Sequence, residues 1–152
     1  MKTVNDAQNY YFDRVEKMSI PAEQDRELEV ADRALELALA AGLDSEEADE
    51  VRLAVIEAVI NAIEHGRSIE GRVQVSFSTG TDPARLAITI GDSGSGFDPS
   101  RVKVPNISEK IGTRQRKRGW GLKIMRSLMD EVVINSSDLG TRVTLIKQSK
   151  MK

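Results

Sequence analysis

Two polar residues interrupt an apolar stretch of the chain at a spacing that suits chemistry. From Leu53 to Ile63 the sequence reads LAVIEAVINAI, in which only Glu57 and Asn61 are polar. Four residues apart on a helix, these side chains project from one face, and we expect the rest of the helix to be buried nearly all round. A carboxylate and an amide oxygen so placed can share a hydrated Mg²⁺. The alternative is a buried hydrogen bond from Glu57 to the backbone or to Arg52.

Two glycine-rich segments further along the chain suit contacts with a flat ligand and with phosphate. Gly91-Asp92-Ser93-Gly94-Ser95-Gly96 comes where an apolar strand is expected to end. An aspartate there can accept a hydrogen bond from an exocyclic amine, and glycines let the chain pass close to a flat ligand. Gly119-Trp120-Gly121-Leu122 opens an expected helix, where free backbone N–H groups and the helix dipole favour phosphate. Each signal is weak alone, because glycine after a strand usually makes only a turn.

The composition is that of an ordinary globular chain. Its 152 residues suffice for one domain with a single core. No apolar run approaches the roughly 18 residues that span a bilayer, and the N-terminal sequence lacks the pattern of a secretion signal. We therefore expect a cytoplasmic protein. The absence of cysteine excludes disulfides, thiol catalysis and cysteine-rich zinc sites.

The charge is nearly balanced overall but unevenly distributed. The net charge of -2 argues against a general binder of nucleic acid or membrane surfaces. Residues 1–64 carry 16 acidic and 6 basic side chains, whereas residues 65–152 carry 8 acidic and 16 basic ones. The basic excess peaks over 101–118. That stretch suits an anionic ligand, and a solvated loop is the alternative.

Apolar periodicity predicts the elements that must position these residues. Helical spacing predicts three helices, over about 23–41, 44–65 and 120–130. Alternation predicts five strands, loosely over 9–20 and more clearly over 72–77, 86–90, 132–134 and 142–146. This order favours an α+β fold, with an antiparallel or mixed sheet covered by helices on one face. The long connection over 93–118 is typical of a lid or binding loop.

Local signals mark the ends of the two N-terminal helices. Gly42 is placed to end the first helix. Asp44, followed three residues later by Glu47, has the pattern of a capping box at the start of the second. Gly66 is placed to end that helix after His65.

The motifs, taken in order, resemble those of a known family. Residues Glu57–His65, EAVINAIEH, resemble the N box of the GHKL ATPases, which include the ATP-binding domains of gyrase, heat-shock chaperones, histidine kinases and mismatch-repair proteins. Asp92–Gly96 resembles the first glycine box of that family, and Gly119–Leu122 resembles the second. Gly140 and Thr141 resemble the Gly-Thr pair that closes the adenine pocket.

This resemblance covers nearly the whole chain and implies its architecture. It implies a single histidine-kinase-like ATPase domain over residues 1–152, with an ATP lid at about 95–118. The implied fold is a two-layer α/β sandwich of the Bergerat type. Its sheet would be mixed but mostly antiparallel, with the helices on one face.

The resemblance also implies roles for individual residues. Asn61 would hold Mg²⁺ against the triphosphate of ATP, and Glu57 would be the general base that orients the attacking hydroxyl. Asp92 would accept a hydrogen bond from the adenine amine, with the support of Thr141. The other implied contacts are all to the nucleotide: Gly94 and Gly96 line it, Gly119, Gly121 and Leu122 offer backbone N–H groups to its phosphates, and Arg118 or Lys117 adds positive charge. The implied cofactors are ATP and Mg²⁺.

One branch of the family is closer than the others. The short chain, the form of the N box and the run Gly121–Val132 resemble the bacterial anti-sigma-factor serine kinases of the general-stress and sporulation switches. Such a protein would bind a sigma factor and phosphorylate a small STAS-type antagonist on serine or threonine. The resemblance implies a homodimer with no direct nucleic-acid or membrane partner. The alternatives are an ATP-binding module that only sequesters a partner and a switch kinase that acts on a scaffold protein.

Overall fold

The computed structural model describes residues 3–5, 10–65, 71–92, 114–137 and 140–150. Its helices are α1 (Glu27–Ala41), α2 (Ser45–His65) and α3 (Arg114–Leu128). The strands of the main sheet are β3 (Arg14–Pro21), β4 (Arg72–Gly80), β5 (Arg85–Gly91), β6 (Glu131–Ser137) and β7 (Gly140–Gln148). A separate two-stranded ribbon consists of β1 (Thr3–Asn5) and β2 (Tyr10–Phe12). Among these residues, no helix combines the length and apolar character needed to cross a bilayer.

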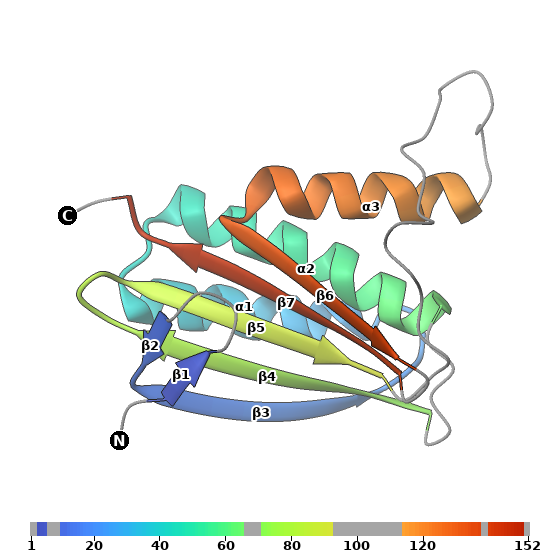
Figure 1. Ribbon diagram of the computed structural model, residues 1–152, viewed down its shortest axis with the longest axis horizontal. Helices are drawn as coiled ribbons and strands as arrows, with labels where there is room; N and C mark the ends of the chain where they lie inside the picture. The colour runs from blue at the N-terminus through green and yellow to red at the C-terminus, as the bar shows by residue number, and fades with distance from the viewer. Residues whose placement is uncertain (1–2, 6–9, 66–70, 93–113, 138–139, 151–152) are drawn as a thin grey trace.

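The main sheet is one layer and the helices are the other. The strand order is β3-β4-β5-β7-β6, and the three helices lie on one face of the sheet (Figure 1). This confirms the predicted α+β fold with helices on one face. Each of the four strand pairs described in this sheet is antiparallel, so the mixed pairing that the resemblance allowed is not seen among them.

Strict alternation along the strands builds the core between the layers. The side chains that face the helices from the three central strands are apolar and almost fully buried; they include Val73, Val75, Phe77, Leu86, Ile88, Ile90, Val143 and Leu145. The helices meet them with small and branched residues, including Val30, Ala34, Ala38, Val51, Val55 and Ala58. The strands predicted over 72–77 and 86–90 are β4 and β5, which pair as an antiparallel hairpin with Gly80 opposite Arg85 beside the turn.

The predicted helix boundaries at the α1–α2 connection are confirmed. Gly42 adopts a left-handed conformation with φ 111°, and its N–H bonds back into α1. The backbone N–H of Glu47 donates to Asp44 Oδ1 over 2.7 Å, and the N–H of Asp44 donates to Glu47 Oε1 over 3.0 Å. This reciprocal pair is the expected capping box and fixes the start of the helix that carries Glu57 and Asn61.

The loose strand predicted over 9–20 is two elements. β2 lies outside the main sheet. Its Phe12 side chain packs against Ala87 and Ile146 on the sheet face that has no helices. The guanidinium of the buried Arg85 lies 5.7 Å from the Phe12 ring centroid. It also donates to the backbone carbonyls of Tyr11, Thr81 and Pro83. One arginine therefore ties β2 to the β4–β5 turn.

The ion pair between Glu16 of β3 and Arg33 of α1 makes the stability of the fold depend on pH. Both of its hydrogen bonds measure 2.6 Å, and those bonds from Arg33 hold the pKa of Glu16 below its usual range. A lowered folded-state pKa stabilises the fold above the unfolded-state pKa, and that stabilisation is lost as the pH falls through the folded-state value.

At pH values above about 5, Glu16→Gln should therefore lower the urea midpoint slightly, and the difference from wild type should shrink as the pH falls through the lowered folded-state pKa of Glu16. The effect is small because both side chains are about two-fifths exposed, at 38% and 41%. Urea titrations of both proteins over a series of pH values from about 6 downward measure it. A midpoint difference that did not change with pH would contradict this linkage.

Candidate functional site

Glu57 and Asn61 lie on α2, the middle helix of the layer. Both side chains are partly buried, and α2 is flanked by α1 on one side and by α3 on the other (Figure 1). The expectation that this helix is buried nearly all round is wrong, since Leu53 is 46% exposed and Ile56 and Ile60 are only partly covered. The reason is geometric, because two neighbouring helices and a sheet leave the fourth side of a helix open to solvent.

Gly121 of α3 lies directly against this pair of polar side chains. A methyl group on Gly121 would be 3.1 Å from Glu57 Oε2 and 3.2 Å from Asn61 Nδ2. Gly121 is itself buried. A carboxylate, an amide and a glycine backbone are thus brought together from two helices that are far apart in the sequence. Any side chain at 121 would fill the space beside the two polar groups.

A second part of the site lies where β5 ends and β7 begins. The backbone N–H of Asp92 donates to the Thr141 carbonyl over 3.1 Å. The Thr141 hydroxyl is buried and lies 3.3 Å from the hydroxyl of Ser136. Because Ile90 and Val143 face the helices, alternation turns Asp92 and Thr141 to that same face. An aspartate and a threonine are therefore held side by side beneath the helix layer.

The two parts lie toward one end of the molecule. The C-terminal ends of α2 and β5 and the N-terminal ends of α3 and β7 all lie toward that end (Figure 1). The structure thus places Gly121 against Glu57 and Asn61, and it sets Asp92 beside Thr141. Leu122 follows Gly121 on α3. Gly94 and Gly96 lie outside the described residues, as does the expected lid from 95 to 113.

The start of α3 differs from the prediction. The helix begins at Arg114 instead of Trp120, so Gly119 and Gly121 lie inside it and the segment 114–118, expected to be lid, is helical. The physical reason is that arginine, glutamine and lysine are good helix formers, so they extend the helix toward the N-terminus past the two glycines. In a helix of this extent the N–H groups of Gly121 and Leu122 face carbonyls four residues earlier. Their exposure to a phosphate would require the first turns to unwind.

The residues present fit a nucleotide bound with Mg²⁺. The alternative partner for Glu57, Arg52, instead donates to Asp32 of α1 over 3.0 Å. Mg²⁺ held together with phosphates takes only one or two protein oxygens and keeps several waters. Asn61 Oδ1 and the Glu57 carboxylate are oxygens of the required kind, and Gly121 leaves room beside them. Within the described ranges, no three His, Cys, Asp or Glu side chains gather as a metal cluster.

Comparisons with known proteins show which family the chain is similar to. The model of the histidine kinase-like ATPase domain matches residues 20–147. A serine-protein kinase RsbW of Bacillus velezensis is 29% identical over 134 residues, which cover 86% of this chain and 83% of that protein. A second RsbW, from Oceanobacillus iheyensis, is 30% identical over 98 residues, or 62% of each chain. An anti-sigma F factor of Bacillus licheniformis is 34% identical over 110 residues, which cover 70% of this chain and 74% of that protein.

A solved structure shares the fold. The crystal structure of the RsbU and RsbW domains of a Mycobacterium tuberculosis protein superposes with a TM-score of 0.65 at 20% identity, over 91% of this chain and 33% of that one. The family match covers most of the chain. Glu57, Asn61, Asp92 and Thr141 belong to the sequence motifs that resemble those of this family. The chain therefore belongs to the histidine kinase-like ATPase family.

Proposed function

We propose that this chain is an anti-sigma factor and an ATP-dependent serine/threonine kinase. It would bind a sigma factor and phosphorylate a small STAS-type antagonist of that binding. The observation that carries the enzymatic half is the contact of Gly121 with both Glu57 and Asn61. The regulatory half is supported by the relatives, which are named serine-protein kinase RsbW and anti-sigma F factor. The whole chain, with its lid at about 95–118, would act as one ATPase domain.

In this proposal each part of the site has one task. Asp92 accepts a hydrogen bond from the adenine amine of ATP, and Thr141 holds that end of β5 in place. Bound Mg²⁺ would neutralise charge on the triphosphate, and Asn61 is the residue that would hold it. Glu57 takes the proton of the substrate hydroxyl, whose oxygen attacks the γ-phosphorus while the bond to the β-phosphate breaks. Phosphoryl transfer of this kind needs mainly positioning and charge neutralisation.

The glycines would admit the nucleotide. Gly94 and Gly96 line it, and Gly119, Gly121 and Leu122 turn their N–H groups to its phosphates once residues 114–120 leave the helix, so that α3 then begins at Gly121. Arg118 or Lys117 adds positive charge there. We also propose that the protein is a cytoplasmic homodimer that acts on protein partners.

The test is a capture experiment followed by a transfer assay. Immobilised protein is incubated with a cell extract from the organism whose genome encodes the chain. Labelled ATP with Mg²⁺ is then added. We expect to recover a sigma factor and to find label on a small antagonist-like protein. Asp92→Ala is the control, and losing the hydrogen bond to adenine should weaken ATP binding by about tenfold or more and reduce the label accordingly.

The alternative readings make different predictions for the same experiment. ATP binding with no labelled protein would overturn the kinase and favour a module that sequesters its partner. Label on a large scaffold protein, with no sigma factor recovered, would overturn the anti-sigma role and favour a switch kinase. Glu57 favours the kinase, because a module that only sequesters its partner has no use for a base at this position.

A further inference from the structure

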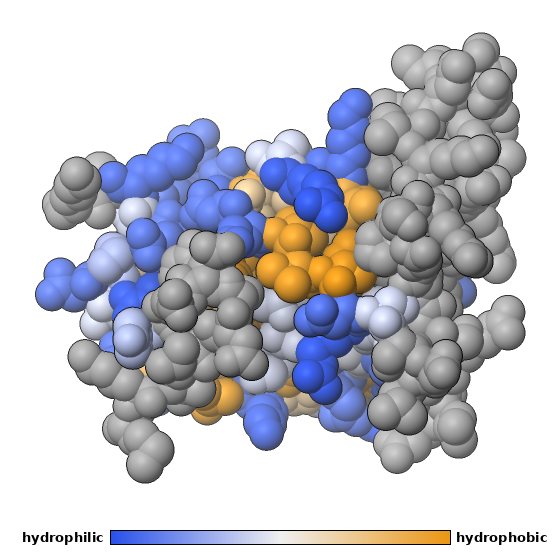
Figure 2. Space-filling view, in the orientation of Figure 1, coloured by the Kyte–Doolittle hydropathy of each residue, from blue (hydrophilic) through white to orange (hydrophobic). Residues whose placement is uncertain are grey.

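Apolar packing leaves α3 less firmly held than the other helices. Its main neighbours are α2 and the edge strand β6. Met125 and Met129 are buried, but Leu122, Ile124 and Leu128 are only partly covered. Figure 2 shows apolar surface still exposed where α3 and β6 meet. Since hydrophobic contact has no direction of its own, it fixes the position of α3 along α2 less sharply than hydrogen bonds do.

The contact between α2 and α3 has a polar group at each end. Glu50, Glu57 and Asn61 follow one another at intervals of seven and four residues, so they share one face of α2. Gly121 and Leu128 are seven residues apart and share one face of α3. At one end of this contact, Gly121 lies beside Glu57 and Asn61. At the other end, the Leu128 carbonyl and the Glu50 carboxylate are joined through Lys147.

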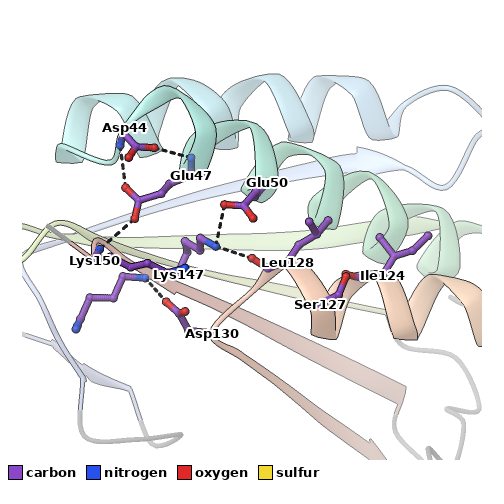
Figure 3. A network of polar contacts seen from close by, with 10 residues as sticks. Asp44, Glu47, Glu50, Ile124, Ser127, Leu128, Asp130, Lys147 and Lys150 are labelled. Carbon is purple, nitrogen blue, oxygen red and sulfur yellow. Dashed lines mark hydrogen bonds and ion pairs between the residues drawn. The ribbon is translucent and has the colours of Figure 1, made fainter.

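The Glu50 end is joined by a buried lysine of β7. Lys147 is 3% exposed, and its Nζ donates to the Leu128 carbonyl over 2.6 Å and lies 3.3 Å from Glu50 Oε1 (Figure 3). A buried ammonium is costly unless it is paired. Here it meets a carboxylate and a carbonyl at the negative end of a helix, where a cation is favoured.

The chain beyond α3 is tied to the same strand. The N–H of Asp130 donates to the Ile146 carbonyl over 2.9 Å, and the N–H of Gln148 donates to Asp130 Oδ2 over 2.7 Å. Lys147 thus belongs to a set of directional bonds that hold the C-terminal end of α3 against β7 (Figure 3). Unlike the apolar contacts, these bonds have a single geometry that satisfies them.

We propose that Lys147, paired with Glu50, is a positioning residue for the nucleotide site. By holding the Leu128 carbonyl, it sets the position of α3 along α2 and so the distance of the Gly121 backbone from Glu57 and Asn61. The helix between them is about 10 Å long and stiff enough to transmit a displacement. This inference rests on the proposed function, because it concerns the binding of ATP at that site.

The test compares variants that separate positioning from folding. Lys147→Met keeps the length and burial of the side chain but removes the ammonium. We expect it to raise the ATP dissociation constant about tenfold, because small displacements of site groups are costly. Lys147→Arg, which keeps the charge and the donors, should recover most of the affinity. Calorimetric titration with Mg·ATP, well below each melting temperature, measures both.

A destabilised control and a milder variant complete the design. Val30→Ala truncates a fully buried side chain of α1, on the far side of α2 from α3. It should lower the melting temperature and leave ATP affinity unchanged. If Lys147→Met does not fold, Glu50→Gln serves instead, since the Glu50 side chain is 32% exposed and tolerates the change. We expect Glu50→Gln to weaken binding in the same direction but less.

The possible results are distinguishable. Wild-type affinity in Lys147→Met and Glu50→Gln, with a lower melting temperature, would overturn the positioning role and leave a purely structural one. Equal losses in Lys147→Met and Lys147→Arg would also overturn it, because the charge would then not matter. Failure of the wild-type protein to bind ATP would instead overturn the proposed function, and no variant is needed to see it.

Discussion

The Glu57→Ala variant is expected to lose phosphoryl transfer by at least about a hundredfold while it still binds ATP. Its carboxylate is the proposed acceptor of the substrate proton, and a positioned base contributes on that scale. Glu57 is only partly buried, and Oε2 faces the Gly121 backbone. Removing the side chain therefore opens space on the side of α2 that faces Gly121. The fold should remain intact.

Single-turnover label transfer measures the first effect, and calorimetric ATP titration measures the second. Asp49→Ala removes an exposed acid from the same helix and should change neither quantity. Transfer at the wild-type rate by Glu57→Ala would show that Glu57 is not the base. A matching loss of ATP affinity would show that Glu57 acts in nucleotide binding instead.

The parts of the fold that are predictable from sequence have local chemical signals. Gly42 ends α1 because a left-handed residue is needed there, and Asp44 with Glu47 caps α2 through two reciprocal bonds. The β4–β5 hairpin follows from alternation interrupted by turn residues. In each case the signal and the structure it specifies lie within a few residues, so no distant contact is needed to interpret it.

The features that sequence does not predict depend on contacts between distant segments. α3 begins at Arg114 because the helix-forming residues before Gly119 extend it, although Gly119 and Gly121 disfavour a helix. Local propensity alone does not predict which of these two effects determines where the helix begins. The burial of α2 depends on how many neighbours it has, which explains the exposure of Leu53. Phe12 belongs to β2 and does not continue into β3, because its side chain packs against Ala87 and Ile146, which are far away in sequence.

The candidate site likewise has features that the sequence predicts and features that it does not. Glu57 and Asn61 stand out because they are polar within an apolar run, but nothing local indicates that Gly121 lies against them. The motifs of the sequence do not single out Lys147. A signal was present, since Val143, Leu145 and Lys147 alternate on one face of a strand and only the lysine is out of place there. A charged residue on an apolar strand face points to a buried partner, although the sequence does not say which one.

Gly121→Ala should damage function without damaging the fold. Alanine is favoured over glycine inside a helix by about 1 kcal/mol, so α3 itself gains stability. The added methyl would lie 3.1 Å from Glu57 Oε2 and 3.2 Å from Asn61 Nδ2, which is too close for both side chains to stay where they are. Both are flexible and can move, so the strain is relieved by displacing the two groups that would act on the nucleotide.

The expected result is a melting temperature near or above that of wild type, with transfer reduced by roughly tenfold to a hundredfold. Thermal unfolding and single-turnover transfer measure the two quantities on one preparation. Ser127→Ala, an exposed position on the same helix, tests whether greater helix stability alone slows the reaction. Gly121→Val adds bulk at the same point and should reduce transfer further. Wild-type transfer by both Gly121 variants would mean that α3 moves away from α2 before the reaction, and that the contact seen here does not shape the working site.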